Sequence, residues 1–198
     1  PCNSAPPPDA VACVSLMHEA KAKALGCPAL VRIRSYAYAA LDPGEQLLQA
    51  PVLAAPWALQ RAGLTLKDMD VVEMHEAFAA QVLSNLKGFE SQYWAERAGF
   101  SKPTGEVDRA KLNVMGGSIA IGHPFGATGA RITTTLLNEL ARRGGQFGLM
   151  TVCAAGGMGF ALVVQRTQGT LLRQSPLAGR AGRAGSLPPP ARSPAAAR

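Results

Sequence analysis

The stretch VVEMHEAFAAQVLSNL, residues 71–86, shows how this chain is expected to fold. It begins with a short apolar run that fits a buried strand, and the run ends at a polar tip containing His75 and Glu76. From Ala77 to Leu86 the apolar residues recur at helical intervals. A strand, a polar tip and a helix in this order are typical of a domain in which helices pack on a sheet.

The same alternation continues toward the amino terminus. The pattern there predicts a buried strand, a short helix, a longer strand and a second helix, at residues 10–17, 18–25, 31–38 and 52–62. On the other side of the opening stretch, residues 88–111 form a long, charged segment that we expect to be a surface insertion.

Toward the carboxy terminus, a glycine-rich loop at residues 116–129 leads into an amphipathic helix whose apolar stripe contains Ile132, Leu136, Leu137 and Leu140. Two apolar runs, residues 147–152 and 158–164, then fit buried strands joined by a tight turn. The sequence therefore predicts an α/β fold, with helices packed on the faces of a mixed sheet.

Composition divides the chain into three parts. Residues 1–8 end in three prolines and lack periodicity, which predicts a linker or a cut end. Residues 9–166 carry the alternating pattern and predict one domain. Residues 167–198 are rich in Ala, Gly, Pro, Ser and Arg, with few large apolar residues, so we expect a disordered tail.

Most of the net charge of +7 lies in this tail, which contains five arginines and no acid. Only +2 remains for the preceding 166 residues. Because the positive and negative charges of this part nearly cancel, it lacks the excess of positive charge that DNA or RNA binding needs. No nucleic-acid partner is therefore expected.

The four cysteines, Cys2, Cys13, Cys27 and Cys153, are spread without CxxC spacing, so no metal site is predicted from them. The sequence also contains no secretory segment and no apolar run long enough to cross a bilayer. We therefore expect a soluble protein from a reducing compartment, and association with a membrane surface is left open.

Three reactive side chains lie where a predicted strand meets a loop: His75, His123 and Cys153. Side chains at such strand ends can converge in a crevice outside the sheet, where α/β proteins commonly build their sites. A thiol with a pKa of about 8.5 is mostly protonated at neutral pH, and a neighbouring histidine can accept its proton. The small residues after Cys153 would let the backbone N–H of Ala155 approach a developing oxyanion.

Each of these residues also has an ordinary structural interpretation. A histidine beside a strand is more often a hydrogen-bonded polar residue than a catalyst, and a cysteine between apolar strands is usually an inert core residue. Glycine-rich segments recur in ordinary turns, and this one lacks the lysine of a phosphate-binding GxxxxGK[ST] loop. Composition and spacing alone therefore predict an α/β enzyme, without deciding whether it uses cysteine and histidine.

Three motifs taken together resemble the thiolase family. They are HEAF at residues 75–78, GGSIAIGHPFGATGAR at residues 116–131 and CAAGGMG at residues 153–159. The resemblance covers residues 9–166 and is to the fatty-acid oxidation branch, which includes the mitochondrial trifunctional protein β-subunit and bacterial 3-ketoacyl-CoA thiolases. It implies the carboxy-terminal half of a layered αβαβα architecture.

The resemblance also implies roles for the reactive residues. His123 would accept the proton of a nucleophilic cysteine and help to polarise the thioester oxygen, and Cys153 would be the acid and base. His75 would hold the water or the donor that completes the oxyanion hole to which His123 contributes, and the Ala155 N–H would serve the acyl-enzyme step. Phe78 would line the pantetheine channel, and Gly122 and Gly156 would also contact the substrate.

The family nucleophile lies upstream of the region that this chain resembles, so we expect these 198 residues alone to be inactive. The resemblance implies coenzyme A as co-substrate and no permanently bound cofactor. Its substrates would be CoA thioesters, and its protein partners would be a second copy, a thiolase partner chain or a hydratase/dehydrogenase subunit. The expected compartment is the mitochondrial matrix or the bacterial cytoplasm.

Two other hypotheses remain. The chain could be a non-catalytic interaction protein that keeps the thiolase fold and binds an intact thiolase. It could also be a related condensing enzyme of the ketoacyl synthase type, but this alternative is weaker because those enzymes usually carry a second histidine where this chain has Cys153.

Overall fold

The computed structural model describes residues 3–167. Within this range the helices are α1 (Glu19–Ala24), α2 (Pro43–Gln46), α3 (Pro51–Ala62), α4 (Ala79–Phe89), α5 (Gln92–Arg97), α6 (Ser118–Ile121) and α7 (Thr128–Arg143), and two 3-10 turns span Leu66–Asp68 and Arg109–Lys111. The strands are β1 (Val31–Ala40), β2 (Val71–Met74), β3 (Phe147–Ala154) and β4 (Met158–Arg166). The tail predicted at residues 167–198 lies outside the described residues, apart from Thr167.

The four strands form one mixed sheet in the order β1-β4-β3-β2. β2 runs parallel to β3, with Met74 opposite Thr151, and the other two pairs are antiparallel. A further parallel bridge joins Val72 to Leu112 beside the β2 edge. The predicted α/β class with a mixed sheet is confirmed.

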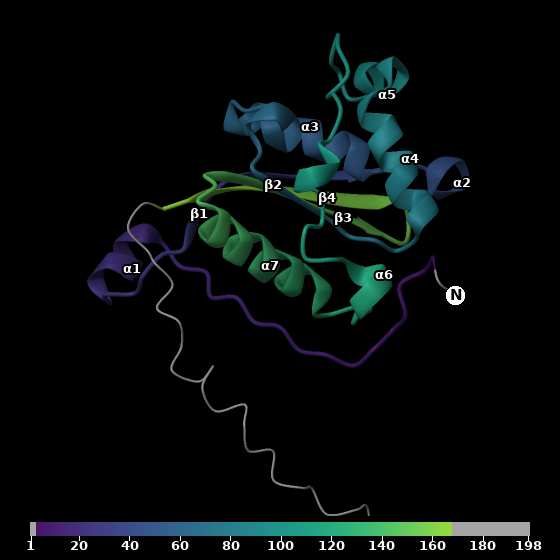
Figure 1. The fold of residues 1–198 in the computed structure, drawn as a ribbon. Coiled ribbons are helices and arrows are strands. Elements are labelled where there is room, and N and C mark those ends of the chain that lie inside the picture. The colour runs from purple at the N-terminus through teal and green to yellow at the C-terminus, as the bar shows by residue number, and fades with distance from the viewer. Residues whose placement is uncertain (1–2, 168–198) are drawn as a thin grey trace, which may run out of the picture.

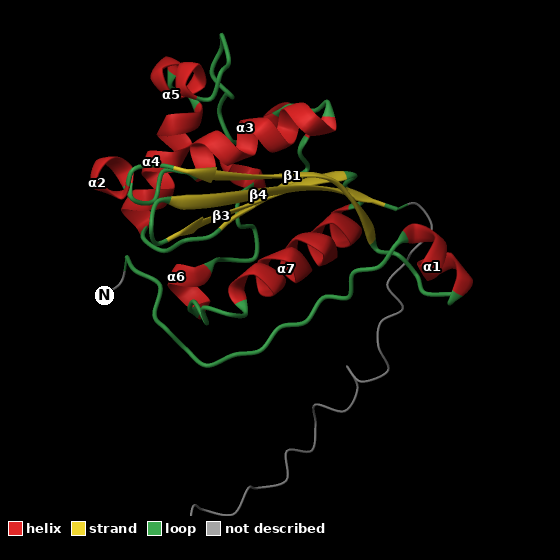
Figure 2. Cartoon of the chain, turned by 180° about the vertical axis from the view of Figure 1, so that it is seen from behind, coloured by secondary structure: helices red, strands yellow, loops and turns green. Residues whose placement is uncertain are grey.

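Helices cover both faces of this sheet (Figure 1, Figure 2). α3, with α4 and α5 beyond it, lies on one face and closes a core that includes Leu149 and Val163. α7 lies on the other face, where Leu136 and Leu140 pack with Met150 and Val164. The apolar stripe predicted for α7 therefore faces the sheet as expected.

Glycines in the left-handed region end the two long helices. Gly63 has φ 69° after α3, and Gly144 has φ 70° after α7. A residue with a Cβ is strained in this conformation, which explains why both helices stop where the sequence predicts. Arg142 and Arg143 occupy the last turn of α7, where positive charge complements the helix dipole.

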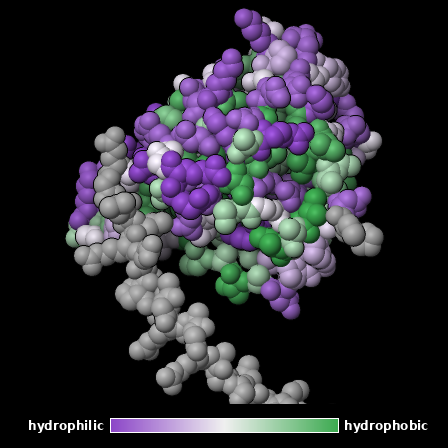
Figure 3. Space-filling view, in the orientation of Figure 1, coloured by the Kyte–Doolittle hydropathy of each residue, from purple (hydrophilic) through white to green (hydrophobic). Residues whose placement is uncertain are grey.

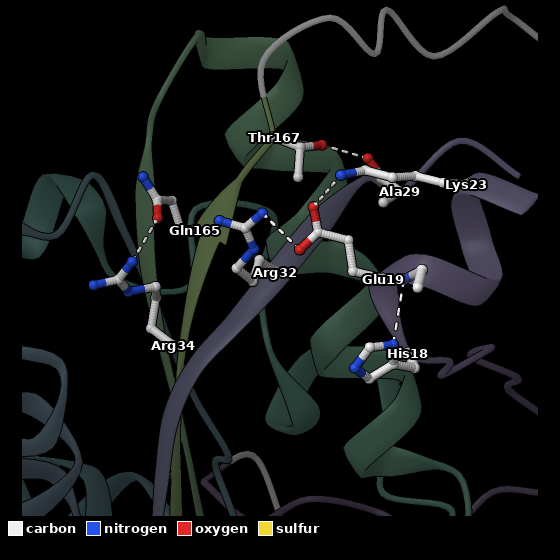
Figure 4. Close-up of polar contacts among 9 residues, drawn as sticks. His18, Glu19, Lys23, Ala29, Arg32, Arg34, Gln165 and Thr167 are labelled. Carbon is white, nitrogen blue, oxygen red and sulfur yellow. Dashed lines mark hydrogen bonds and ion pairs between the residues drawn. The ribbon is translucent and has the colours of Figure 1, made fainter.

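The short helix α1 is attached to the end of β1 by charged contacts (Figure 4). The Glu19 carboxylate forms ion pairs with Lys23 and Arg32, at 2.9 Å in each case. The Thr167 hydroxyl donates to the carbonyl oxygen of Ala29 nearby. Because these groups are exposed, the two ion pairs contribute little to stability.

The strand predicted at residues 10–17 is wrong. This segment has no strand or helix and crosses below α7 as an extended chain (Figure 1). The side chains of Val11 and Leu16 are 96% and 77% exposed. The apolar residues are suited to a strand, but within residues 3–167 no neighbouring strand pairs with them.

The prediction of a surface insertion at residues 88–111 is only partly right. The side chains of Phe89, Ala95 and Val107 are buried in this segment. Trp57 of α3 donates its indole N–H to the carbonyl oxygen of Ala98 at 2.8 Å. The segment therefore extends the core on the α3 side of the sheet.

No helix within residues 3–167 combines the length and the apolar character that a membrane crossing needs.

Candidate active site

Two of the predicted site residues meet at the end of β2. The backbone N–H of His75 donates to the carbonyl oxygen of Thr151 in β3 at 2.9 Å, which fixes the residue beside the neighbouring strand. His75 is 2% exposed, and its imidazole packs against the ring of His123 at a tilt of 41°, with 4.1 Å between ring centroids. Residues 48 positions apart in the sequence thus form a histidine pair at one edge of the sheet.

His123 is held in place by the segment at the start of the described chain. Its backbone N–H donates to the carbonyl oxygen of Pro6 at 2.7 Å. A Cβ on Gly122, which has φ 95°, would lie 2.4 Å from a ring carbon of Pro8. Ala5 also bonds to Ala77 through its backbone. Residues 3–8, expected as a linker or cut end, therefore line the histidine loop.

Glu76 anchors the glycine-rich loop to the end of β2. Its carboxylate accepts from the Asn113 side-chain amide at 2.6 Å and from the backbone N–H of Ile119 at 3.1 Å. A Cβ on Gly117 would lie 2.1 Å from this carboxyl carbon, so only glycine allows the close approach. Asn113 adopts φ 46° and also bonds both backbone groups of Met74. These contacts set where α6 and His123 lie.

The histidine pair is neutral at pH 7. Burial lowers the pKa of His75 to about 4, and repulsion from His123 and from the Arg131 guanidinium acts in the same direction. Burial, followed by Arg131, also lowers the pKa of His123. Neutral imidazoles can accept a proton, and they can donate one hydrogen bond each without carrying charge.

Cys153 lies on the neighbouring strand, two residues beyond Thr151. It is 5% exposed and pairs with Gly159 of β4. Burial raises the pKa of its thiol to about 11, so the sulfur is protonated at neutral pH. Among the described residues, no hydrogen bond joins this sulfur to either imidazole. The structure therefore brings the two histidines into contact and places the cysteine on the adjoining strand.

The remaining predicted residues lie on exposed turns or at a helix start. Ala155 and Gly156 are exposed in the turn between β3 and β4, where Gly156 has φ 88°. Phe78 precedes α4 and its ring is 48% exposed. Their backbone and side chains are accessible to a ligand.

Two polar residues that the sequence did not single out, Ser118 and Thr128, contact the histidines, and a third, Arg131, contacts Ser118. Ser118 lies 3.0 Å from Nδ1 of His75 and accepts from the Arg131 guanidinium at 2.8 Å. Thr128 lies 2.7 Å from Nδ1 of His123. All three belong to the glycine-rich motif, but their spacing from the histidines carries no recognisable pattern.

A buried acid lies on β2, two residues before His75. Glu73 is 1% exposed, and burial raises the pKa of its carboxyl to about 8 although Arg131 opposes the change. One of its oxygens, Oε1, has no hydrogen-bond partner within the described range. The protonated carboxyl is therefore the stable form of Glu73 in the folded protein at neutral pH.

These two buried groups predict how stability depends on pH. Between about pH 4.5 and 8 the folded state holds a proton on Glu73 that the unfolded state releases, so stability falls as the pH rises. Between about pH 4 and 6.5 only unfolded His75 is protonated, so stability rises with pH. Up to pH 6.5 the two groups change the free energy of unfolding in opposite directions. Between pH 6.5 and 8 only the Glu73 contribution remains.

We expect the free energy of unfolding in urea to fall by up to about 2 kcal/mol between pH 6.5 and 8, since one pKa unit corresponds to about 1.4 kcal/mol. Glu73→Gln should remove this decrease, whereas Glu106→Gln at an exposed position should retain it. An unchanged decrease in Glu73→Gln would show that another group causes it.

The groups of this site are suited to proton transfer. Two neutral imidazoles and a protonated thiol can accept, donate and hold protons without a change in oxidation state. Within residues 3–167, no group of three or more His, Cys, Asp or Glu side chains is placed to hold a metal ion.

Comparison with known proteins gives a consistent result. The family profile described as the thiolase C-terminal domain matches residues 27–166. The chain is 56% identical over 164 residues to 3-ketoacyl-CoA thiolases of Yersinia pestis and Yersinia pseudotuberculosis, which is 82% of this chain and 38% of each relative.

The crystal structure of human mitochondrial 3-ketoacyl-CoA thiolase matches with a TM-score of 0.62 and 40% identity. The match covers 75% of this chain and 33% of that one. The chain thus spans little more than a third of the length of the relatives it matches.

Proposed function

Because this chain belongs to the thiolase family, we propose that it supplies the acid–base half of a 3-ketoacyl-CoA thiolase of fatty-acid oxidation. The enzyme would cleave a 3-ketoacyl-CoA with coenzyme A into acetyl-CoA and a shortened acyl-CoA. The observation that carries this proposal is the neutral histidine pair at 4.1 Å, beside the strand that bears a protonated thiol. Coenzyme A would be a co-substrate, with no permanently bound cofactor.

In the first half-reaction His123 takes the proton of the nucleophilic cysteine, which belongs to the amino-terminal half of the family fold. The thiolate attacks the 3-keto carbon, and the carbonyl oxygen becomes an oxyanion that His75 and protonated His123 stabilise. Collapse breaks the carbon–carbon bond and releases the enolate of acetyl-CoA. Cys153, which burial keeps in the protonated thiol form at neutral pH, protonates this enolate and becomes a thiolate.

In the second half-reaction the Cys153 thiolate takes the proton of the incoming coenzyme A. The CoA thiolate attacks the acyl-enzyme, and the Ala155 N–H stabilises the oxyanion that forms. The nucleophile then recovers its proton from His123. Phe78, Gly122 and Gly156 would contact the pantetheine and acyl portions of the substrate.

Complementation tests this proposal. The chain mixed with the amino-terminal half of a 3-ketoacyl-CoA thiolase should catalyse thiolysis of acetoacetyl-CoA, followed by loss of its absorbance. Each half alone should be inactive. Steady thiolysis by the chain alone would overturn the assignment of the nucleophile to the other half, and a folded but inactive complex would overturn the proposed function.

The names of the relatives support the expected compartments, since one relative is mitochondrial and the others are bacterial. We expect the mitochondrial matrix or the bacterial cytoplasm. The partners would be a second copy, a thiolase chain or the hydratase/dehydrogenase subunit.

A second function is favoured by exposed apolar surface: the chain could bind a thiolase without catalysing the reaction. Hydrophobic side chains lie among polar ones on the lower side of the molecule, where α6 and the amino-terminal segment are found (Figure 3). On β1, Ile33, Tyr36 and Tyr38 are between 44% and 69% exposed on the sheet face beside α7. Size-exclusion chromatography of the chain mixed with an intact thiolase tests this function. Elution of the chain as a monomer that does not bind the thiolase would contradict it.

A further inference from the structure

We infer that Ser118 and Arg131 are positioning residues that fix the proton of His75 on Nε2, so that this imidazole donates a hydrogen bond while His123 offers a lone pair. The catalytic meaning of this arrangement rests on the proposed function. The positions of the protons depend only on the hydrogen bonds described below.

Ser118 is fully buried beside the histidine pair. Its hydroxyl oxygen lies 2.8 Å from the Arg131 guanidinium, which can only donate, and 3.0 Å from Nδ1 of His75. Within residues 3–167 the imidazole nitrogen is the sole acceptor in reach of the hydroxyl hydrogen. Because an unsatisfied buried hydroxyl is costly, Ser118 donates to Nδ1, and His75 carries its proton on Nε2.

Thr128 fixes the opposite tautomer of His123. The Thr128 hydroxyl donates to the carbonyl oxygen of Pro124 at 3.1 Å, one turn earlier in the chain. The same oxygen lies 2.7 Å from Nδ1 of His123, and having given its hydrogen to Pro124 it can only accept there. His123 therefore carries its proton on Nδ1 and keeps an unprotonated Nε2.

The two neighbouring imidazoles thus have complementary functions. Among the described residues, Nε2 of neither histidine has a hydrogen-bond partner, and neither atom belongs to the fully buried polar atoms that lack one. Nε2 of His75 is left to donate to an oxyanion, and Nε2 of His123 is left to accept the thiol proton. Two histidines with the same tautomer would supply only one of these functions.

Arg131 contributes in two ways. Its hydrogen bond occupies one lone pair of Ser118 and so directs the hydroxyl hydrogen toward His75. Its positive charge also opposes protonation of both imidazoles. Protonation would place a hydrogen on both nitrogens of each ring and so remove the difference between the two tautomers. Glu73, which interacts electrostatically with Arg131, is the nearby acid in this buried group.

Nitrogen-15 NMR of the histidine side chains tests the inference directly, because the chain contains only three histidines. In the unaltered chain near neutral pH, the two-bond correlations should show His75 protonated on Nε2 and His123 protonated on Nδ1. The third histidine, His18, accepts from the Ala20 N–H through its Nδ1. A proton on Nδ1 of His75 would overturn the inference without any variant.

Variants then show which residues determine the tautomer of His75. Ser118→Ala should shift the ratio of the His75 tautomers roughly 5- to 10-fold toward Nδ1–H, the effect of losing one hydrogen bond. Ser118→Thr should retain the original tautomer, and Arg131→Gln should shift it in the direction of Ser118→Ala. His123 should keep its Nδ1 proton in all three variants. An unchanged His75 spectrum in Ser118→Ala would refute the positioning role.

The NMR result is separable from the proposed function. Failure of complementation with the expected tautomers present would contradict the thiolase assignment alone. Full thiolysis with His75 protonated on Nδ1 would contradict this inference alone.

Discussion

Cys153→Ala is expected to slow thiolysis of acetoacetyl-CoA by the complemented enzyme about 10²- to 10⁴-fold, the usual contribution of a positioned acid–base group. The buried thiol has its pKa raised to about 11, so it holds the proton that the acetyl-CoA enolate needs. Alanine fits the space of the buried side chain but has no proton to give. Steady-state kinetics should show the loss in kcat with a smaller change in KM.

Cys13→Ala and Cys27→Ala are matched controls, because both thiols are free and exposed in the described chain. Both variants should retain the activity of the unaltered enzyme. A Cys153→Ala enzyme with more than a tenth of that activity would contradict the assignment of Cys153 as acid and base.

Leu136→Ala is expected to lower the free energy of unfolding by about 2–5 kcal/mol, the range for removing a buried leucine side chain. Leu136 is fully buried where α7 meets the sheet. It occupies the space beside Gly148 of β3, where a Cβ would lie 2.7 Å from its Cδ1. Urea unfolding measures this loss, and Leu83→Ala on the exposed side of α4 should change stability by less than about 0.5 kcal/mol.

The contact with Gly148 makes a double-mutant test possible. Gly148→Ala alone should destabilise the protein by about 1–3 kcal/mol, because its methyl group crowds Leu136. In the Leu136→Ala background the same methyl group enters the space that was vacated, so the second change should cost less. Strictly additive losses would contradict the described packing of α7 on β3.

Elements with a long and regular apolar pattern could be predicted from the sequence. α3 and α7 were found because their apolar residues recur at helical spacing and a glycine ends each helix. β3 and β4 were found because both are buried apolar runs joined by a glycine turn. In each case the apolar pattern that predicts the element, and the glycine that ends it, lie within or directly beside that element.

Elements that depend on distant partners could not be predicted in the same way. The apolar residues 10–17 have the composition of a strand, but a strand needs a neighbour that the sequence pattern does not reveal. The placement of β1 beside β4 and the contact between residues 3–8 and the histidine loop also depend on tertiary structure. Local patterns contain no information on these contacts.

The residues of the candidate site also divide into those that the local sequence identifies and those that depend on tertiary contacts. His75 and His123 were identified because each is a histidine at a strand end or in a glycine loop, and the structure brings their rings together. The sequence did not identify three further residues, Ser118, Thr128 and Arg131. They are common residue types, and their function depends on the atoms that they face in the fold. The participation of Cys153 stays a prediction, because no hydrogen bond within residues 3–167 joins it to the imidazoles.

A crystal structure of the chain in complex with the amino-terminal half and a bound CoA thioester is the direct test of the proposed site. We expect Nε2 of His75 and Nε2 of His123 to lie within hydrogen-bond distance of the same substrate oxygen or of the nucleophile beside it. The Cys153 sulfur should face the carbon that becomes the enolate. A thioester bound elsewhere, or Cys153 turned away from the acyl group that the histidines contact, would contradict it.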